Sequence, residues 1–203
     1  MSQYKVGLVQ TGTANIASVR AALQRLGGEP VPAETPAQIL SASHLVLPGV
    51  GAFGAAMQNL EQAGLVEALR TRLQKGSPTL VICLGLQLLA ETSEESPGVK
   101  GLGIVSGSIT RFSDELRVPQ FGWSSVNATE QCHYLHSGYS YFANSYCMRD
   151  IPEGWDVALS DYGGKYVAAM ERDGVLACQF HPELSGAWGH GLISRWLEQK
   201  RSA

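Results

Sequence analysis

The chain has 203 residues, of which 44% are hydrophobic and 16% charged, and its formal net charge is −3. This length and balance are typical of one globular domain, so we expect a single domain over residues 1–203. The small negative charge does not indicate a nucleic-acid surface. The first ten residues, MSQYKVGLVQ, do not have the pattern of a signal peptide, and no apolar run reaches membrane-spanning length.

The cysteine pattern indicates a reducing compartment. The four cysteines are far apart in the sequence, at positions 83, 132, 147 and 178. A chain of this size can fold around a hydrophobic core without disulfides. We therefore expect free thiols and a cytoplasmic location.

The first half of the chain alternates short apolar runs with helical patterns. Four strands are predicted, at 4–9, 29–32, 44–49 and 79–82. The intervening helices are predicted at 15–28, where Gly27-Gly28 supply the stop, at 35–40 and at 65–76. Thr35 and Gln38 have the spacing of a capping box. This alternation indicates βαβ units and a parallel sheet.

After about residue 100 the pattern becomes strand-rich. Strands are predicted at 102–112 and 140–146, and three more within 156–181, joined by tight turns at Gly163-Gly164 and Asp173-Gly174. The amphipathic segment LISRWLEQK, at 192–200, predicts a closing helix. The expected fold class is therefore α/β: an open, mostly parallel central sheet with flanking helices and an antiparallel C-terminal extension.

Three chemically distinctive segments follow predicted strands. They are PGVG at 48–51, Cys83, and FHPE at 180–183. In an open parallel sheet, ligands bind beyond the carboxyl ends of the strands. Segments distant in the sequence are thus expected to meet at one edge of the sheet.

Cys83 lies between an apolar strand and a helical pattern in PTLVICLGLQLLAE. A nucleophile at such a turn is exposed, and the backbone amides that follow it point at a developing oxyanion. The helix dipole also favours the thiolate. The alternative is a small buried hydrophobic residue, the usual fate of a free cysteine. Val81 counts against the turn, because a small residue is preferred two positions before the nucleophile.

His181 and Glu183 strengthen the catalytic interpretation. A cysteine needs a base to become a good nucleophile at neutral pH, and a carboxylate orients that base. The alternative for His181 alone is a hydrogen-bonded histidine at a strand end, beside a solvated glutamate. Cys83, His181 and Glu183 at strand ends of one sheet favour a catalytic triad.

Two other motifs have less specific patterns. GVGAFG, at 49–54, fits the dinucleotide-binding pattern, but it follows the third strand and has no acidic residue about twenty positions on, near Gln74 and Lys75. CHYLH offers Cys132, His133 and His136, whose spacing matches no zinc pattern. We interpret the first as glycines that let a backbone approach an oxyanion, and the second as a polar loop.

Together, ICLGLQLL, LPGVGAF and QFHPELSG resemble the class I, triad-type glutamine amidotransferases. The blocks TGTANIASVRAAL, SEES, VPQFGW and YFANSY are similar to one branch of that family. Members of this branch supply ammonia to a TIM-barrel cyclase, which makes imidazole glycerol phosphate in histidine biosynthesis. The resemblance runs from about Val6 to Trp196 and implies the fold described above.

The resemblance also implies residue roles. Cys83 would attack the side-chain amide of glutamine, His181 would transfer protons, and Glu183 would orient it. The oxyanion donors would be the amides of Val50 and Leu84. The remaining roles are glutamine binding, by Gly51, Gln87, Ser145 and Tyr146, and contact with the cyclase, by Asn15, Trp123 and Asn144. No metal or organic cofactor is implied, and no nucleic acid or membrane.

The chain departs from the family's usual residues at several positions: Gln10, Val81, Gln120 and the QFGWS block around it, Asn144 and Leu184. Two alternatives therefore stand beside the leading interpretation. One is a diverged triad glutaminase that feeds a different synthase. The other is a non-catalytic assembly subunit, in which Val81 has cost the chain a competent nucleophile turn.

Overall fold

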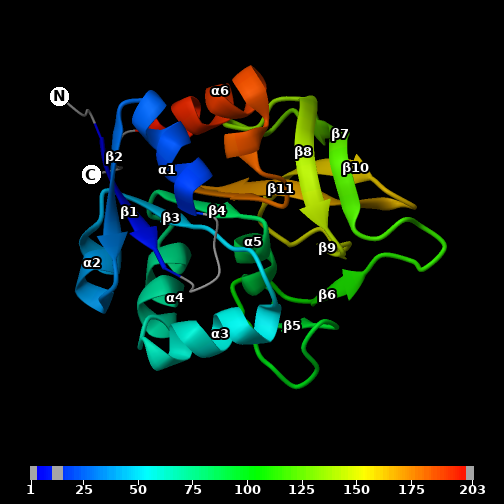
Figure 1. The fold of residues 1–203 in the computed structure, drawn as a ribbon, viewed down its shortest axis with the longest axis horizontal. Helices are drawn as coiled ribbons and strands as arrows, with labels where there is room; N and C mark the ends of the chain where they lie inside the picture. Colours follow the sequence, from blue (N-terminus) through cyan, green and yellow to red (C-terminus); the bar gives the residue numbers. More distant parts are fainter. Residues whose placement is uncertain (1–3, 11–15, 200–203) are drawn as a thin grey trace.

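The computed structural model describes residues 4–10 and 16–199. They form a nine-stranded sheet of order β2-β1-β3-β4-β12-β11-β10-β7-β8, and a three-stranded sheet of order β5-β6-β9 (Figure 1). The first five strands of the large sheet are parallel and the others antiparallel. The predicted fold class is confirmed.

The parallel half places the ends of its central strands side by side. Its strands are β1 (Tyr4–Val9), β2 (Gly28–Ala33), β3 (His44–Leu47), β4 (Thr79–Ile82) and β12 (Val175–Cys178). β12 pairs with β4 from Val175↔Thr79 to Cys178↔Ile82. The residues that follow Ile82 and Cys178 therefore emerge at the same edge.

Helices cover both faces of this half. One side carries α1 (Ile16–Arg25) and α6 (Gly186–Leu197), and the other carries α2 (Pro36–Ser41), α3 (Phe53–Gln62), α4 (Val66–Gln74) and α5 (Leu84–Leu88) (Figure 1). The buried apolar residues accordingly form two clusters, one under α1 and α6 and one under the other four helices. The capping box at Thr35 and Gln38 is present.

The antiparallel half extends the sheet beyond β12. Its strands are β11 (Lys165–Arg172), β10 (Asp156–Asp161), β7 (Gln120–Ala128) and β8 (Gly138–Asn144). The small sheet contains β5 (Thr92–Ser93), β6 (Ser108–Arg111) and β9 (Tyr146–Met148). Both expected tight turns form, with positive φ at Gly163 (62°), Gly164 (114°) and Asp173 (53°).

Three boundaries differ from the sequence prediction. Only 108–111 of the predicted strand 102–112 is a strand, because Gly103 and Gly107 adopt φ of 61° and 101°. The predicted strand 140–146 is two strands, β8 and β9, which belong to different sheets. The last helix begins at Gly186 instead of 192, and its glycine-rich start hides it from the apolar pattern.

The free-thiol prediction is confirmed for all four cysteines. Over residues 4–10 and 16–199, no helix is long and apolar enough to cross a membrane.

Candidate active site

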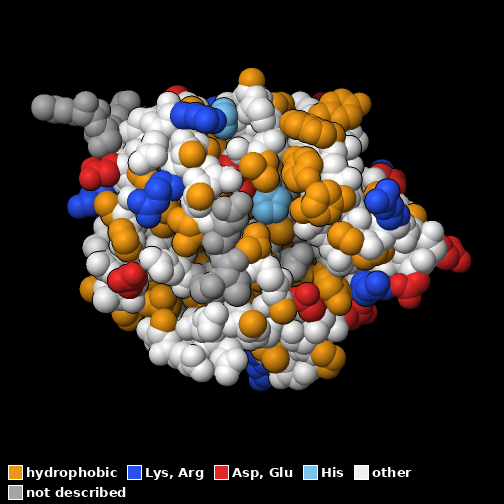
Figure 2. Space-filling view, in the orientation of Figure 1, with side chains coloured by type: hydrophobic (Ala, Val, Ile, Leu, Met, Phe, Trp, Pro, Cys, Tyr) orange, Lys and Arg blue, Asp and Glu red, His pale blue; other side chains and the backbone are white. Residues whose placement is uncertain are grey.

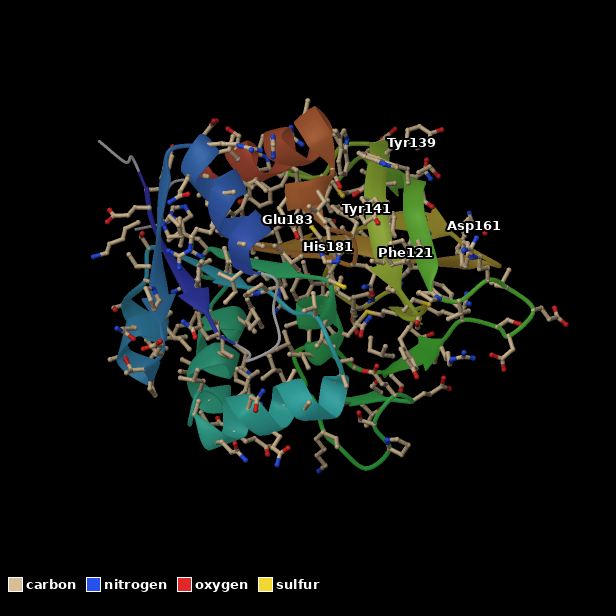
Figure 3. All side chains as sticks on the ribbon, viewed as in Figure 1. Phe121, Tyr139, Tyr141, Asp161, His181 and Glu183 are labelled. Atoms are coloured by element: carbon tan, nitrogen blue, oxygen red, sulfur yellow. The ribbon has the colours of Figure 1, made fainter. Side chains whose placement is uncertain are left out.

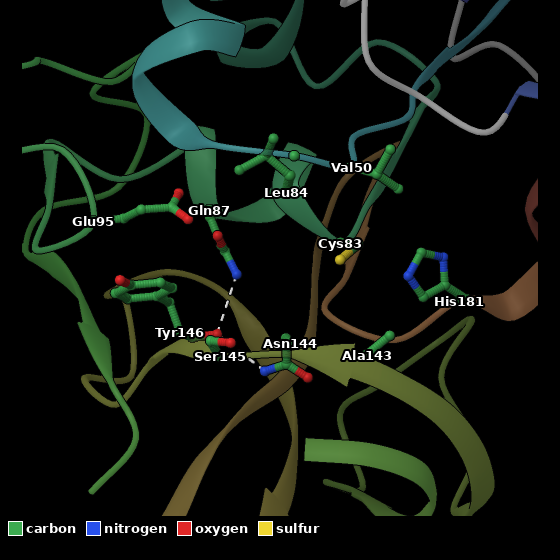
Figure 4. A pocket seen from close by; sticks show the side chains of 11 residues that line it. Val50, Cys83, Leu84, Gln87, Glu95, Ala143, Asn144, Ser145, Tyr146 and His181 are labelled. Atoms are coloured by element: carbon green, nitrogen blue, oxygen red, sulfur yellow. Dashed lines mark hydrogen bonds between the residues drawn. The ribbon is translucent and has the colours of Figure 1, made fainter. Parts of the chain in front are cut away.

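The three segments predicted to converge do so at the carboxyl edge of the parallel strands. PGVG follows β3, Cys83 follows β4, and His181 lies three residues after the end of β12. A pocket of about 200 Å³ opens there (Figure 4). Its lining combines the turn residues with the start of the small sheet: Val50, Gly51, Cys83, Leu84, Gln87, Glu95, Ala143, Asn144, Ser145, Tyr146 and His181. This volume suits a small molecule rather than a dinucleotide.

Cys83 occupies a strained turn between β4 and α5. Its φ of 53° and ψ of −111° lie in a region that L-residues rarely adopt. Its N–H donates to the Cys178 carbonyl at 2.7 Å, which ties the turn to the end of β12. Such strain at the apex of a strand-to-helix turn is typical of a nucleophile.

Val81 does not prevent this turn. Its side chain is buried, and a Cβ placed on Gly85 would lie 2.9 Å from its Cγ1 and 2.5 Å from the Leu47 carbonyl oxygen. Gly85 therefore leaves the space that Val81 occupies. The geometry therefore gives no steric reason for Val81 to cost the chain its nucleophile turn.

His181 and Glu183 form a buried pair beside Cys83. His181 Nδ1 lies 2.9 Å from Glu183 Oε1, and both side chains are largely buried. The carboxylate therefore fixes the Nδ1–H tautomer and leaves Nε2 as the other ring nitrogen. In Figure 4 the imidazole stands next to the Cys83 sulfur.

The electrostatics of this pair favour a protonated imidazole. Burial lowers the pKa of His181, but the hydrogen bonds and charges of Cys83 and Glu183 outweigh burial and raise it to about 10. An imidazolium beside a sulfur stabilises the thiolate, which is the reactive form of cysteine. The arrangement can thus support both nucleophilic attack and proton transfer.

The backbone at PGVG has one peptide turned toward the nucleophile. The Leu84 N–H donates to the Gly49 carbonyl at 3.3 Å. Since the Gly49 carbonyl points at Leu84, the N–H of the same peptide, on Val50, points the opposite way. The Leu84 donor is therefore occupied in this conformation. Gly51, with φ of 101°, allows the next residue an unusual backbone path.

The four residues predicted to bind glutamine, Gly51, Gln87, Ser145 and Tyr146, all line the pocket. Gln87 Nε2 donates to the Tyr146 carbonyl and to Gln179 Oε1, each at 3.1 Å.

Glu95 also lines the pocket, and the residue-by-residue prediction missed it. One of its carboxylate oxygens accepts the Phe53 N–H at 2.6 Å. The only sequence signal for Glu95 was the SEES block.

The two competing motifs have structural explanations. The first amides of α3 are taken by side chains, Phe53 N–H by Glu95 and Gly54 N–H by Ser96 Oγ at 2.9 Å, so they are not open to a phosphate. In the CHYLH loop, the buried Glu171 carboxylate accepts the backbone N–H groups of His133, Tyr134 and Leu135. Among residues 4–10 and 16–199, no group of three or more His, Cys, Asp or Glu side chains is placed to hold a metal ion.

Two of the three residues predicted to meet a partner, Trp123 and Asn144, lie on opposite faces of one hairpin. Trp123 is 57% exposed on the outer face of β7, whereas Asn144 on β8 is 4% exposed and lines the pocket. The alternation of strand side chains explains the difference. Asn144 thus offers little surface to a partner, and Asn15 lies outside the described residues.

Trp123 belongs to an exposed hydrophobic patch on this outer face. Its other large members are Phe121 and Tyr139, with exposed fractions of 70% and 66%. Tyr141 packs edge-on against both Phe121 and Trp123. Figures 2 and 3 show hydrophobic side chains gathered beside His181, at the mouth of the pocket.

A comparison with known families identifies the family of the chain. The family model described as "Glutamine amidotransferase class-I" matches residues 9–198. The chain belongs to the class I glutamine amidotransferases.

Relatives within this amidotransferase family carry a common name. The protein from Symbiobacterium thermophilum named "Imidazole glycerol phosphate synthase subunit HisH" is 40% identical over 197 residues, covering 95% of this chain and 92% of its own length. A HisH protein from Methanothermobacter thermautotrophicus is 38% identical over 196 residues, covering 95% of this chain and 98% of its own. The Arabidopsis thaliana protein named "Imidazole glycerol phosphate synthase hisHF, chloroplastic" is 40% identical over 207 residues; the match covers 98% of this chain but 35% of that longer protein.

Solved amidotransferase structures share the fold. The structure described as "Crystal structure of glutamine amidotransferase" superposes with a TM-score of 0.76 at 24% identity, over 95% of this chain and 97% of that one. "Structure of PurLQS from Thermotoga maritima" gives 0.70 at 16% identity, over 96% and 97%.

Proposed function

We propose that this chain is the glutaminase subunit of an imidazole glycerol phosphate synthase, acting in histidine biosynthesis. It hydrolyses glutamine to glutamate and ammonia and passes the ammonia to a cyclase. The observation that carries the proposal is the buried His181–Glu183 pair beside Cys83 on its strained turn, at the mouth of a small pocket. The identity to HisH proteins over most of the chain supports the choice of synthase.

The first half of the reaction forms a thioester. The Cys83 thiolate attacks the side-chain amide carbon of glutamine, and a C–S bond forms while the carbonyl oxygen becomes an oxyanion. His181 Nε2–H then gives its proton to the amide nitrogen, the C–N bond breaks, and ammonia leaves. The raised pKa of His181, about 10, supports this role because the imidazole begins the step protonated.

The second half regenerates the enzyme. Neutral His181 takes a proton from water, and the hydroxide formed attacks the thioester carbon. The C–S bond breaks, glutamate leaves, and the thiolate and imidazolium are restored together. Glu183 stays ionised and keeps Nδ1–H directed at itself, so that Nε2 faces the reacting atoms in both halves.

Several groups in the lining of the pocket would hold glutamine. The Glu95 carboxylate, already anchored by the Phe53 N–H, suits the α-ammonium group of the substrate. Both Gln87 N–H groups are used within the protein, so its Oε1 is the atom left to accept from a ligand. Gly51, Ser145 and Tyr146 complete the lining.

The oxyanion would be stabilised by the amides of Val50 and Leu84 after one rearrangement. Rotating the Gly49–Val50 peptide would withdraw the Gly49 carbonyl from the Leu84 N–H and turn the Val50 N–H inward. One rotation would thus supply both donors. Loss of a single oxyanion donor typically slows such chemistry about 10²–10³-fold. The conformation described here is therefore expected to be slow until the peptide turns.

The partner would be a TIM-barrel cyclase bound at the exposed patch of Phe121, Trp123 and Tyr139. Exposed apolar patches rimmed by polar residues mark interaction surfaces. This patch adjoins the mouth of the pocket, so a partner seated there would receive ammonia without its release to water. The Arabidopsis relative, in which the matching region is 35% of one chain, supports a second component.

Two further features belong to the proposal. The whole of 1–203 would act as one amidotransferase domain, since the family match spans most of it. Its four free cysteines and its biosynthetic role support a cytoplasmic location.

The test is steady-state glutamate production from glutamine, first with the chain alone, then with the cyclase, and then with the cyclase and its nucleotide acceptor. We expect a low rate that rises when the acceptor is added. Since Gln120, Asn144 and Leu184 depart from the family's usual residues, we also expect measurable glutaminase activity before the acceptor is present. Equal rates in the last two conditions would argue against a switch at Val50.

Complementation of a histidine auxotroph that lacks the glutaminase subunit tests whether the chain serves imidazole glycerol phosphate synthase or a different synthase. Growth without histidine is expected. Glutaminase activity without complementation would favour a diverged enzyme that feeds a different acceptor, and absence of both would favour an assembly subunit.

A further inference from the structure

Gln179 makes contacts that the catalytic triad does not explain. It follows β12 directly, just as Cys83 follows β4, and the Cys178↔Ile82 pairing brings the two residues side by side. Its side chain is 0% exposed, and its Nε2 lies 3.7 Å from the Cys83 sulfur. Its own N–H donates to the Ala168 carbonyl at 2.8 Å, which fixes its backbone.

The hydrogen-bond network fixes which end of this amide faces the sulfur. The Tyr146 carbonyl can only accept, so Gln87 must point Nε2 toward it. The same Nε2 then needs a second acceptor, which Gln179 Oε1 provides at 3.1 Å. Gln179 Nε2 is thereby left facing Cys83 as a donor. The opposite orientation would set two donors against each other and place an oxygen lone pair beside the sulfur.

We propose that Gln179 is a positioning residue that stabilises the Cys83 thiolate by N–H donation and, through its other end, sets the orientation of Gln87 in the glutamine pocket. The inference rests on the proposed role of Cys83 as nucleophile. It adds a neutral donor to the sulfur, besides the imidazolium. It also links the residue that would contact the substrate to the residue that would attack it.

Two substitutions separate the two ends of the Gln179 amide. Gln179→Met removes both the donor and the acceptor at similar length. Gln179→Glu keeps the shape and the acceptor for Gln87 but replaces the donor beside the sulfur with a carboxylate oxygen. Gln120→Met is the matched control, because Gln120 is also buried and hydrogen-bonded, to Tyr166 and Ser124, but lies outside the pocket.

The measurement is the rate of Cys83 alkylation by iodoacetamide as a function of pH, followed on the Cys83 peptide by mass spectrometry in the full-length chain. A hydrogen bond to a charged group corresponds to a midpoint shift of about one to two pH units. The long contact of 3.7 Å between Gln179 Nε2 and the sulfur places the expected shift lower, at about half to one unit. We expect Gln179→Met to move the midpoint upward by about that amount and to slow alkylation at neutral pH about three- to tenfold. Gln179→Glu is expected to move the midpoint at least as far, because its carboxylate also repels the thiolate. Gln120→Met is expected to leave the midpoint in place.

Glutaminase kinetics of the same variants test the other end of the Gln179 amide, the Oε1 that accepts from Gln87. The KM for glutamine is expected to rise in Gln179→Met, where Gln87 loses its acceptor, and to stay within about twofold of wild type in Gln179→Glu. Unchanged midpoints in both variants, even with lowered thermal stability, would mean that Gln179 only fills the core and would overturn the proposal. Because alkylation needs no turnover, this result is independent of whether glutamine is the substrate.

Discussion

The central parallel strands are buried on both faces, whereas the outer antiparallel hairpin is covered on only one. β3, β4 and β12 are buried at every residue, whereas β7 and β8 mix buried and exposed positions. A strand covered on both faces can present chemistry only at its end, which is where Cys83 and His181 stand. A strand covered on one face can present a row of side chains, which is how Trp123 and Tyr139 reach the surface.

The difference suggests a division of labour in the amidotransferase. The parallel half would supply the reaction, and the antiparallel half would supply the pocket wall and the partner surface. Changes at the strand ends should then abolish turnover and leave partner binding intact. Changes on the outer face of β7 and β8 should do the reverse.

The most severe test removes the nucleophile from the parallel half. Cys83→Ala is expected to abolish glutamine hydrolysis, because no thioester can form, while cyclase binding is retained. A glutamine-analogue alkylator is expected to label Cys83 in the wild-type chain, as located by peptide mass spectrometry. A label on Cys132, Cys147 or Cys178 instead would contradict the assignment.

The next test ranks the two members of the proposed triad that follow β12. His181→Ala is expected to lower the turnover number about 10²–10⁴-fold, since one imidazole carries both proton transfers. Glu183→Gln keeps a group beside Nδ1 and is expected to cost less. A greater loss in Glu183→Gln would reverse the roles assigned to this pair.

The residues of the proposed triad could be predicted from the sequence, because each follows an apolar run and the ends of parallel strands meet at one edge of the sheet. Glu95 and Gln179 were not, because their roles depend on contacts with residues distant in the chain, such as Phe53 and Cys83. β7 was missed for a related reason: exposed aromatic residues on its outer face break the usual polar–apolar alternation.

Two other features of the structure could not be predicted from the sequence, because they too depend on strand pairing or on the conformation of a single peptide. Whether Trp123 faces outward and Asn144 inward follows from the pairing of β7 with β8, which propensity does not specify. The occupied Leu84 N–H depends on one peptide orientation at Gly49, and the sequence indicates only that glycine permits more than one.

The third test addresses the outer face. Trp123→Ala is expected to weaken cyclase binding about 10- to 100-fold, because exposed tryptophans at the centre of such patches commonly dominate binding energy. Titration calorimetry with the cyclase would measure this loss. The glutaminase rate of the isolated chain is expected to stay unchanged.

Leu40→Ala is the matched control for Trp123→Ala. Leu40 is also an exposed apolar residue, but it lies on α2, at the other end of the sheet from β7 and β8 (Figure 1). An equal loss of affinity in both variants, or none in Trp123→Ala, would mean that the partner binds elsewhere.

The smallest expected effect is on the pH dependence of the unfolding free energy, and it arises from His181 in the parallel half. Burial lowers the pKa of His181, but Cys83 and Glu183 raise it from 6.5 to about 10. The folded chain therefore binds this proton more tightly than the unfolded chain. The resulting stabilisation is complete below about pH 6.5 and is lost as the pH rises through about 10.

The difference in unfolding free energy between wild type and His181→Gln, from urea titrations, is expected to be larger at pH 6 than at pH 10. A wild-type advantage that grew toward pH 10 would show that His181 is held neutral in the folded chain, contrary to the ion pair described here.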